Sequence, residues 1–460
     1  MSQKDYRTAP LPITTMPPGI PCIVGNEAAE RFSFYGLKCL LVVFMTKFML
    51  DRAGNPAFLG EVKAREWFHH WSSACYLFPV LGAFLSDTVL GKYRTIIWLS
   101  LVYCAGHAAL FLDLTREGLW IGLGLIALGT GGIKPCVSAH VGDQFGVGNQ
   151  HLLARVFGWF YFSINFGSFF STLLTPWLMD GFCQRFGLDP KLGPHLAFGV
   201  PGVLMFIATF IFWLGRRSYA HVPPGGRKFW AEVKSPEGLR CLGRLAILYV
   251  FVAIFWSLYD QTFSAWIQQA EKMDRHFLGV NWLSAQTQAV NPLLILIYIP
   301  LFSYVIYPVV NRIWPLTPLR KMGIGFVLTA VSFLIPALIE HWLAQGKTVN
   351  IGWQLLGYTI LTAAEVMVSI TGLEFSYTQS PRTMKSVVMS LWLLSVSLGN
   401  QFTALINHFI ANKDGTSKLT EQHYYLLFAG VMAAATVVYV FVARKYQTRS
   451  YLQETEGSAG

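Results

Sequence analysis

Charged residues are scarce in this sequence. They make up only 13% of its 460 residues, whereas an ordinary soluble domain carries about 25%. The deficit runs along the whole chain, which excludes a soluble protein with a single membrane anchor. The sequence also lacks the alternation of apolar and polar residues over about ten positions that porin-like barrels need. Segments such as 98–112 and 425–442 are apolar without alternation, so helices are predicted instead.

Patterns that hold metals or carry out covalent chemistry are also missing. The 7 cysteines are odd in number and lie mostly inside apolar stretches, which is typical of small core residues. His69 and His70 form the only adjacent histidine pair, and the sequence has neither a Cys/His metal spacing nor a Gly-x-Ser-x-Gly elbow. We therefore expect no cofactor and no metal, and the protein is not predicted to be an enzyme.

The sequence is rich in long apolar stretches. A transmembrane helix needs roughly 20 mostly apolar residues, and about twelve such stretches follow one another with short polar connections. We predict helices over 22–50, 67–89, 94–113, 118–144, 153–179, 196–214, 243–268, 285–311, 322–343, 352–377, 385–411 and 424–443. The predicted fold class is an all-α integral membrane protein.

The net charge of +11 could suggest a nucleic-acid partner, but its distribution argues against one. Basic residues gather in the even-numbered connections, among them Lys92 and Arg94, and in the tail after residue 443, whereas the odd connections mix both signs. This is the positive-inside bias of a membrane protein. It predicts a plasma (inner) membrane protein with both termini in the cytoplasm and no nucleic-acid partner.

The stretches divide into two sets of six. We expect a cytoplasmic tail over 1–21, a six-helix bundle over 22–214, a basic cytoplasmic linker over 215–242, a second six-helix bundle over 243–443 and a cytoplasmic tail over 444–460. A cleaved signal peptide is not expected, because the first apolar stretch contains charges and lacks a cleavage site. Transporters are commonly built from two such halves, with the substrate near the midplane.

The connection after the second stretch has a recognisable pattern. Residues 82–94 read G-A-F-L-S-D-T-V-L-G-K-Y-R, which resembles the loop signature of the major facilitator superfamily. A carboxylate such as Asp87 at the C-terminal end of a helix is unfavourable unless it meets a cation or a helix N-terminus. We therefore assign Asp87, Lys92 and Arg94 to conformational gating.

The predicted helices of the first half carry charges that are costly in a membrane and usually functional. Glu27, Glu30 and Arg31 lie within one turn, and Glu27 can pair with Arg31 because they are four residues apart. Lys38 lies about two turns further on. Lys134 has no neighbour in the sequence that could neutralise it, so Glu27 or Glu30 is its expected partner.

The second half carries acids at comparable depth. Asp260 falls in the seventh stretch, and Glu365 and Glu374 fall in the tenth. These charges could merely tie the helices together. Acids and bases contributed by both halves instead favour a wet chamber between them, and buried carboxylates with changing neighbours can carry protons.

Four motifs resemble the proton-coupled oligopeptide transporter family of the major facilitator superfamily. Residues 26–36 read N-E-A-A-E-R-F-S-F-Y-G, similar to the family's E-x-x-E-R-F-x-Y-Y, with Phe34 replacing the first tyrosine. The others are G-T-G-G-I-K-P at 129–135, F-Y-F-S-I-N-F-G-S at 160–168 and G-L-E-F-S-Y-T-Q-S-P at 372–381. The resemblance extends over about residues 25–444, and it implies the major facilitator fold with about 12 transmembrane helices in two bundles.

The details look most like the animal peptide transporters. His69 lies seven residues before Tyr76, as the proton-linked histidine of that branch does, although a histidine near Trp67 and Trp71 could also be interfacial. The chain lacks that branch's large extracellular insert between the ninth and tenth helices. The segment 215–242 is also too short for the two extra helices of many bacterial members.

The resemblance assigns roles to particular residues. A zwitterionic dipeptide has its charged ends about 5–7 Å apart, at about 3.5 Å per extended residue, so its site should have two poles. The substrate-binding residues are expected to be Tyr35, Lys38, Tyr76, Lys134, Asn165, Trp256, Asn291, Glu365 and Trp392. The carboxylate would be held by Lys38, Lys134 and Arg31, and the amino group by Glu365. Proton coupling is expected from Glu27, Glu30, Arg31, His69 and Asp260.

The predicted function is a proton-coupled symporter that imports di- and tripeptides by alternating access. Its partners would be these peptides, protons and the lipid bilayer. A proton symporter for nitrate or another small anion is the alternative within the same family, but it would have no need of a negative pole at Glu365. A drug–proton antiporter is a further alternative, and it should lack the linked motifs of the first half.

Overall fold

The computed structural model describes residues 6–224, 235–379, 385–413 and 416–446. The helices of the first half are α1 (Ile20–Lys47), α2 (Glu61–Leu85), α3 (Lys92–Leu112), α4 (Arg116–Gly142), α5 (Leu153–Pro176), α6 (Phe182–Phe186) and α7 (Leu192–Leu214). Those of the second half are α9 (Pro236–Tyr259), α10 (Ala265–Glu271), α11 (Val290–Leu301), α12 (Tyr307–Ile313), α13 (Pro318–Ala344), α14 (Gly352–Glu365), α15 (Thr371–Thr378), α16 (Lys385–Ile410) and α17 (Glu421–Lys445).

The predicted all-α membrane architecture is confirmed. Ten helical runs in the described part of the chain are long and apolar enough to cross a membrane, and the long helices α1 and α5 accompany them. A short hairpin of β1 (His276–Phe277) and β2 (Val280–Asn281) is the only sheet among the described residues. The helix predicted from residue 243 starts earlier, at Pro236, because Ser235 caps it by accepting a hydrogen bond from the Gly238 amide. The predicted linker and tails include residues 1–5, 225–234 and 447–460, which lie outside the described residues.

Several membrane-spanning runs change their helical geometry partway. A 3₁₀ turn over Asp260–Phe263 joins α9 to α10, and a π turn over Val366–Ile370 joins α14 to α15 directly after Glu365. A further π turn over Phe302–Ile306 joins α11 to α12 after Pro300. Irregular turns of this kind frequently occur at functional sites, and two of these follow or contain acids singled out in the sequence.

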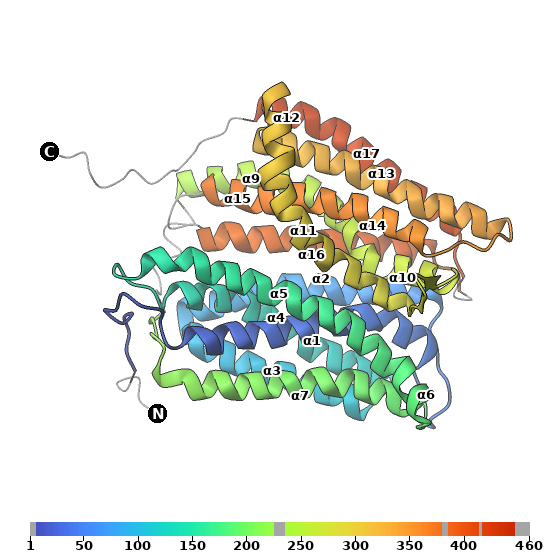
Figure 1. The fold of residues 1–460 in the computed structure, drawn as a ribbon, viewed down its shortest axis with the longest axis horizontal. Helices are drawn as coiled ribbons and strands as arrows, with labels where there is room; N and C mark the ends of the chain where they lie inside the picture. Colours follow the sequence, from blue (N-terminus) through green and yellow to red (C-terminus); the bar gives the residue numbers. More distant parts are fainter. Residues whose placement is uncertain (1–5, 225–234, 380–384, 414–415, 447–460) are drawn as a thin grey trace.

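The helices form two groups that lie side by side, α1–α7 in one and α9–α17 in the other (Figure 1). The groups meet mainly where α2 packs on α16 and where α5 packs on α11. α1 begins and α17 ends at the same end of the molecule. We call this the terminal end, and the end with the connections 48–60, 272–283 and 411–420 the distal end.

Close packing of α2 against α4 depends on glycine. A Cβ atom on Gly82 would collide with the Cα atom of Gly132, and one on Gly131 would collide with Phe78. Gly131 and Gly132 belong to the stretch of α4 that directly precedes Lys134. Because the two backbones approach so closely, the Lys134 side chain is brought onto the neighbouring face of α2.

Candidate functional site

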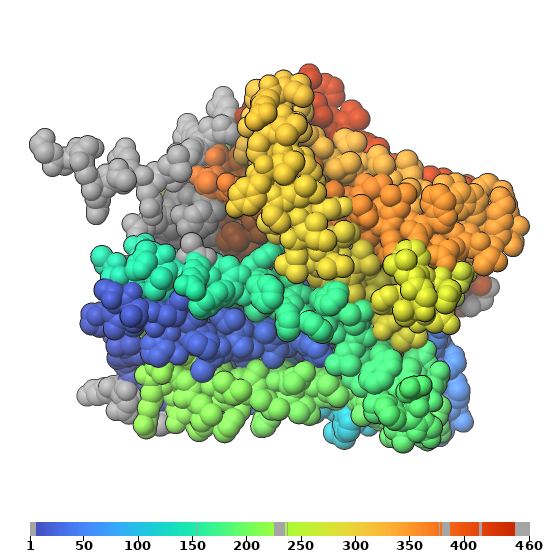
Figure 2. Space-filling model, viewed as in Figure 1, coloured from blue at the N-terminus to red at the C-terminus, as the bar shows by residue number. Residues whose placement is uncertain are grey.

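A cavity of about 150 Å³ lies between the two halves. Its walls from the first half are Tyr35, Lys38, Tyr76, Tyr161, Ile164, Asn165 and Ser168. Its walls from the second half are Trp256, Tyr259, Asp260, Phe263, Gln288, Asn291, Pro292, Ile295 and Glu365. The space-filling view shows a recess between α5 and the ridge of α11 and α12, toward the terminal end (Figure 2). Eight of the nine expected substrate-binding residues line this cavity or touch a residue that does; Trp392 is the exception.

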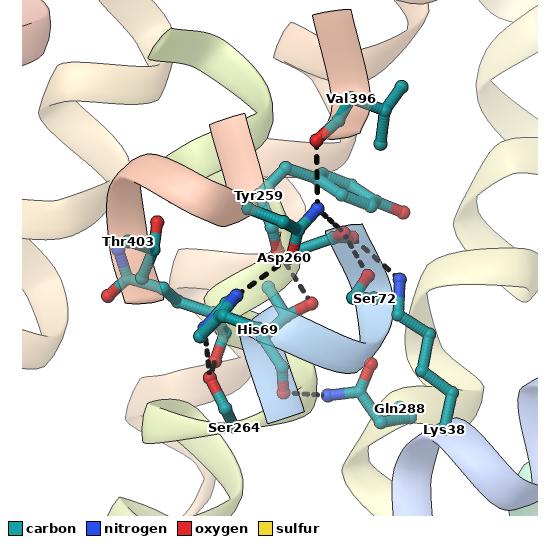
Figure 3. A network of polar contacts seen from close by, with 12 residues as sticks. Lys38, His69, Ser72, Tyr259, Asp260, Ser264, Gln288, Val396 and Thr403 are labelled. Atoms are coloured by element: carbon teal, nitrogen blue, oxygen red, sulfur yellow. Dashed lines mark hydrogen bonds and ion pairs between the residues drawn. The ribbon is translucent and has the colours of Figure 1, made fainter. Parts of the chain in front are cut away.

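An ion pair ties the halves together beside this cavity. The Lys38 ammonium on α1 lies 2.7 Å from Oδ1 of Asp260, and both side chains are almost fully buried. The other carboxylate oxygen accepts hydrogen bonds from Ser72 Oγ at 3.2 Å and from Asn400 Nδ2 at 2.6 Å (Figure 3). Lys38 is therefore already neutralised by Asp260 in this arrangement, and it can meet a substrate carboxylate only if this pair opens.

His69 belongs to the same network. Its ring nitrogens lie 2.8 Å from Asn400 Oδ1 and 2.9 Å from Ser264 Oγ, and both partners come from the second half (Figure 3). The side chain is completely buried. His69 therefore lies between the halves and not in the aromatic belt of the membrane surface, and Asn400 connects it directly to Asp260.

The acids of α1 share a single cation. Arg31 Nε lies 2.7 Å from Glu27 and 3.1 Å from Glu30, which confirms the expected pairing of Glu27 with Arg31. Glu30 also accepts a hydrogen bond from the Thr130 hydroxyl on α4. One oxygen of Glu27 and one of Glu30 are buried without a hydrogen-bond partner. Two buried carboxylates thus share one guanidinium, which leaves one excess negative charge. Protonation of one carboxylate would neutralise it.

Lys134 does not pair with either acid, contrary to the sequence-based expectation. Its buried ammonium has no hydrogen-bond partner and no ion-pair partner within the described residues. It lies 3.6 Å from the ring centroid of Phe34 and 4.2 Å from that of Tyr76. The reason is local, because Arg31 lies on the same helix as Glu27 and Glu30 and forms an ion pair with each of them. Tyr76 lines the cavity, so Lys134 is one side chain away from it.

Glu365 provides the opposite pole. It lines the cavity directly and accepts a hydrogen bond of 2.7 Å from Asn291 Nδ2, and Tyr259 is also placed to bond to it. No lysine or arginine in the described part of the chain pairs with it. Among the described residues near the cavity, Lys134 in the first half and Glu365 in the second have no ion-pair partner, and Glu27 and Glu30 share the single cation Arg31.

The remaining expected substrate contacts divide into two groups. Asn165, Asn291, Tyr35, Tyr76 and Trp256 line the cavity. Trp392 does not; it is buried in the second half, edge-on to Tyr249, with its ring where a Cβ on Gly372 would be. Because Gly372 has no side chain, the Trp392 indole packs directly against its backbone, and Trp392 is not among the residues that line the cavity.

The three gating candidates lie at the terminal end. The Lys92 ammonium lies 2.7 Å from Asp143, which follows α4, so this ion pair stays within the first half. Asp87 accepts a hydrogen bond of 3.2 Å from its neighbour Ser86. Arg94 is exposed beside a small pocket that it shares with Tyr6 and His221. Among the described side chains Asp87 forms no ion pair, so the cation is not the one of its two expected partners that it meets in this arrangement.

Sequence reasoning missed several lining or linking residues. Tyr161 could have been found, because it lies four residues before Asn165 and its carbonyl accepts the Asn165 side-chain amide. Tyr259 immediately precedes Asp260. Asn400 and Gln288 gave no such signal, since their importance arises only from contacts with distant segments.

Comparisons with known proteins agree on one family. A sequence model described as the POT family matches residues 93–235 and 226–424. The chain is 39% identical to human "Solute carrier family 15 member 2" over 78% of its own length and 54% of the relative's. It is 28% identical to "Peptide transporter family 1" of Drosophila melanogaster over 99% of this chain and 90% of that one. The chain spans about half the length of most of the curated relatives it matches, for example 51% of human "Solute carrier family 15 member 1".

Solved structures give the same result. The fold is similar to that of an auto-inhibited POT family peptide transporter, with a TM-score of 0.83 and 35% identity over 95% of this chain and 99% of that one. The POT family transporter PepTSo matches with the same score and identity over 94% of this chain. Together with the twelve-helix arrangement, these matches fix the family and leave the substrate to be argued from the site.

Proposed function

The chain belongs to the POT family of integral membrane transporters, and on this premise we propose that it is a proton-coupled importer of di- and tripeptides. The observation that carries the proposal is the leftover charge at the cavity. Within the part of the chain that the structure describes, Lys134 in the first half is a cation without an ion-pair partner, and Glu365 in the second half is an anion without one. A zwitterionic peptide has the complementary charges at its two ends.

In this proposal the peptide carboxylate binds Lys134 and the amino group binds Glu365. Asn165 and Asn291 can each donate and accept, so they suit the peptide's backbone groups. Tyr35, Tyr161 and Trp256 provide aromatic walls, which accept varied side chains because burial of apolar area is not directional. Lys38 and Arg31 would join the carboxylate only after leaving Asp260 and the α1 acids.

Proton coupling follows from the same charge count. Arg31 serves both Glu27 and Glu30, so protonation of one acid matches the remaining charges and frees part of the guanidinium. His69 and Asp260 link the halves through Asn400, so a proton on His69 would alter that link. The driving force is sufficient, because one proton crossing about 100 mV releases roughly 2.3 kcal/mol and one pH unit adds about 1.4 kcal/mol. Together they support several-hundred-fold accumulation.

The membrane orientation is part of the proposal. The terminal end carries the start of α1, the end of α17 and the basic residues Lys92 and Arg94, so we place it in the cytoplasm and the distal end outside. Opening toward the terminal end would then release a peptide into the cell.

The test is uptake by proteoliposomes with an imposed pH gradient. We expect accumulation of dialanine but not of free alanine, and little competition from nitrate. Glu30→Gln should abolish proton-driven uptake while leaving exchange of labelled for unlabelled peptide. Nitrate uptake in place of peptide uptake would establish the small-anion alternative. Peptide uptake that does not depend on the pH gradient would rule out coupling to protons.

The two poles can be tested separately. Lys134→Gln should remove the preference for dialanine over dialanine amide, which lacks the carboxylate. Glu365→Gln should remove the preference for dialanine over N-acetyl-dialanine, which lacks the amine. If both variants lost both preferences equally, the assignment of one pole to each end of the peptide would be wrong.

A further inference from the structure

Phe34 stands where the sequence departs from the family motif, and the function described so far gives it no role. Its side chain is completely buried beside Lys134. The Lys134 ammonium lies 3.6 Å from the centroid of this ring, closer than to any other aromatic ring that it contacts among the described residues. Lys38 is farther away, at 6.0 Å, and is paired with Asp260.

A buried ammonium with no partner is normally unstable. An aromatic face attracts a cation through its quadrupole, and the attraction is strongest where water is excluded. Unlike a carboxylate or an amide, the face does not accept a conventional hydrogen bond from the ammonium. The three donors of Lys134 therefore stay unengaged while its charge is stabilised.

A second ring completes the arrangement. Tyr76 stands edge-on to Phe34, with centroids 6.3 Å apart, and its face lies 4.2 Å from the same ammonium. Because Tyr76 lines the cavity, the ammonium is held between one ring in the core and one ring at the cavity wall. Trp71 also packs against Phe34, with the two ring centroids 5.8 Å apart.

We propose that Phe34 is a positioning residue for carboxylate recognition: its ring face seats the Lys134 ammonium with its hydrogen-bond donors free, ready for the C-terminal carboxylate of a peptide. The inference rests on the proposed function, because it concerns the same pole of the same site. It adds that carboxylate specificity depends on a residue whose side chain carries no polar group.

The experiment compares two ligands in the purified full chain. Binding of dialanine and of dialanine amide is measured by calorimetry, and the ratio of the two dissociation constants reports carboxylate recognition. Phe34→Met keeps similar volume without a ring, so we expect the ratio to fall by about 10–30-fold, the equivalent of about 1.4–2 kcal/mol. Phe34→Tyr keeps the ring face and should retain the ratio within about threefold.

Phe44 provides the matched control. It is a buried phenylalanine on the same helix, packed edge-on against Phe198 and touching no cation. Phe44→Met should lower thermal stability as Phe34→Met does but leave the ratio unchanged. If Phe34→Met does not fold, Phe34→Leu takes its place.

The outcomes separate the inference from the proposed function. A ratio unchanged by Phe34→Met, or lowered equally by Phe44→Met, would overturn the inference while leaving peptide transport intact. A wild-type ratio near one would overturn both the inference and the role of Lys134. Absence of dialanine binding and uptake by the wild type would instead refute the proposed function.

Discussion

The two ends of the interface between the halves are closed very differently. At the distal end, ion pairs cross from one half to the other: Lys47 with Glu271, Lys272 with Glu61 at 2.8 Å, and Arg65 with Glu421 at 2.8 Å. A hydrogen bond of 3.2 Å between His408 and Glu66 also crosses there. At the terminal end, the side chains that the structure describes form no ion pair between the halves; Glu237 and Lys385 are not among them. The Lys92–Asp143 pair found there stays within the first half.

This difference indicates the conformational state. The halves are locked at the distal end by opposite charges, and the central Lys38–Asp260 pair continues that lock inward to the cavity. The same helices must separate there if the cavity is to open toward the distal end. The strength of each link should follow its burial, because a buried pair that loses one partner leaves an uncompensated charge, whereas an exposed pair is screened by water.

Opening of the cavity toward the distal end can be measured with a single reporter cysteine. Ser168 lines the cavity on α5, so Ser168→Cys should react with an impermeant maleimide added at the distal side only when that side opens. The seven native cysteines are buried or partly buried, and the parent chain gives their background. The labelling rate of a variant reports opening at the distal end, and its melting temperature reports stability.

The largest effect is expected at the central pair. Asp260→Asn leaves the Lys38 ammonium buried without a counter-charge, which should cost the distally closed state about 3–5 kcal/mol. Labelling of the reporter from the distal side should therefore rise by at least about 100-fold. The double variant Lys38→Gln with Asp260→Asn removes both charges and should give a smaller rise. Labelling that stayed at the wild-type rate would show that this pair does not hold the halves closed.

The next effect is expected at Arg65. Its side chain is 1% exposed, pairs with Glu421, bonds to Gln268 and stacks on Tyr424 at 4.9 Å. Arg65→Gln should weaken distal closure by about 1–3 kcal/mol, because Glu421 is partly exposed and water can replace the lost partner. The charge exchange Arg65→Glu with Glu421→Arg should restore part of the wild-type labelling rate. Failure of the exchange to restore anything would mean that Arg65 acts through packing alone.

A smaller effect is expected at the terminal end, and on stability instead of opening. Lys92→Gln should lower the unfolding free energy by about 0.5–1 kcal/mol at neutral pH. Burial raises the pKa of Asp143 above its ordinary value, while Lys92 pulls it down. The folded state therefore binds this proton more tightly than the unfolded chain, and the resulting stabilisation, present in acid, is lost as pH rises through the folded pKa.

Removing Lys92 should raise that pKa further, so the penalty should be visible at pH 7 and shrink as the pH falls and Asp143 becomes protonated. Melting curves at several pH values check this. A penalty that is equal at all pH values would point to lost packing instead of a lost ion pair.

The smallest effect is expected at Lys272. Its side chain is 38% exposed and that of its partner Glu61 is 42% exposed. Lys272→Gln should change distal labelling by no more than about fivefold, corresponding to about 0–1 kcal/mol, and the change should disappear in about 1 M salt. A large, salt-independent effect would break the proposed ranking by burial.

The fold was predictable from local patterns, and so was the presence of charged residues inside the membrane helices. Each apolar stretch of about twenty residues predicts a membrane helix without reference to any other segment. A charge inside such a stretch is conspicuous for the same reason, which is how Lys134 and Glu365 were found. The start of α9 at Pro236 was not predicted, because its N-cap, Ser235, lies in a polar segment that was assigned to the linker.

The pairing of the charges was not predictable. The sequence correctly paired Glu27 with Arg31, since four residues on a helix bring them together. It paired Lys134 with Glu27 or Glu30, but both of these acids pair with Arg31. It also placed Trp392 at the cavity, whereas the indole packs in the space beside Gly372. Lys38 and Asp260 are 222 residues apart, and no local spacing could join them.

The sequence by itself determined that this chain spans a membrane as two sets of helices, with acids and bases at the depth of a cavity. Those properties depend on hydrophobicity and charge within single segments. Only the tertiary structure decided which charges form ion pairs, which have no ionic partner among the described residues, and at which end ion pairs join the halves. Those outcomes depend on distances of a few ångströms between helices far apart in the chain, where a buried charge is stable only beside the particular partner that packing brings to it.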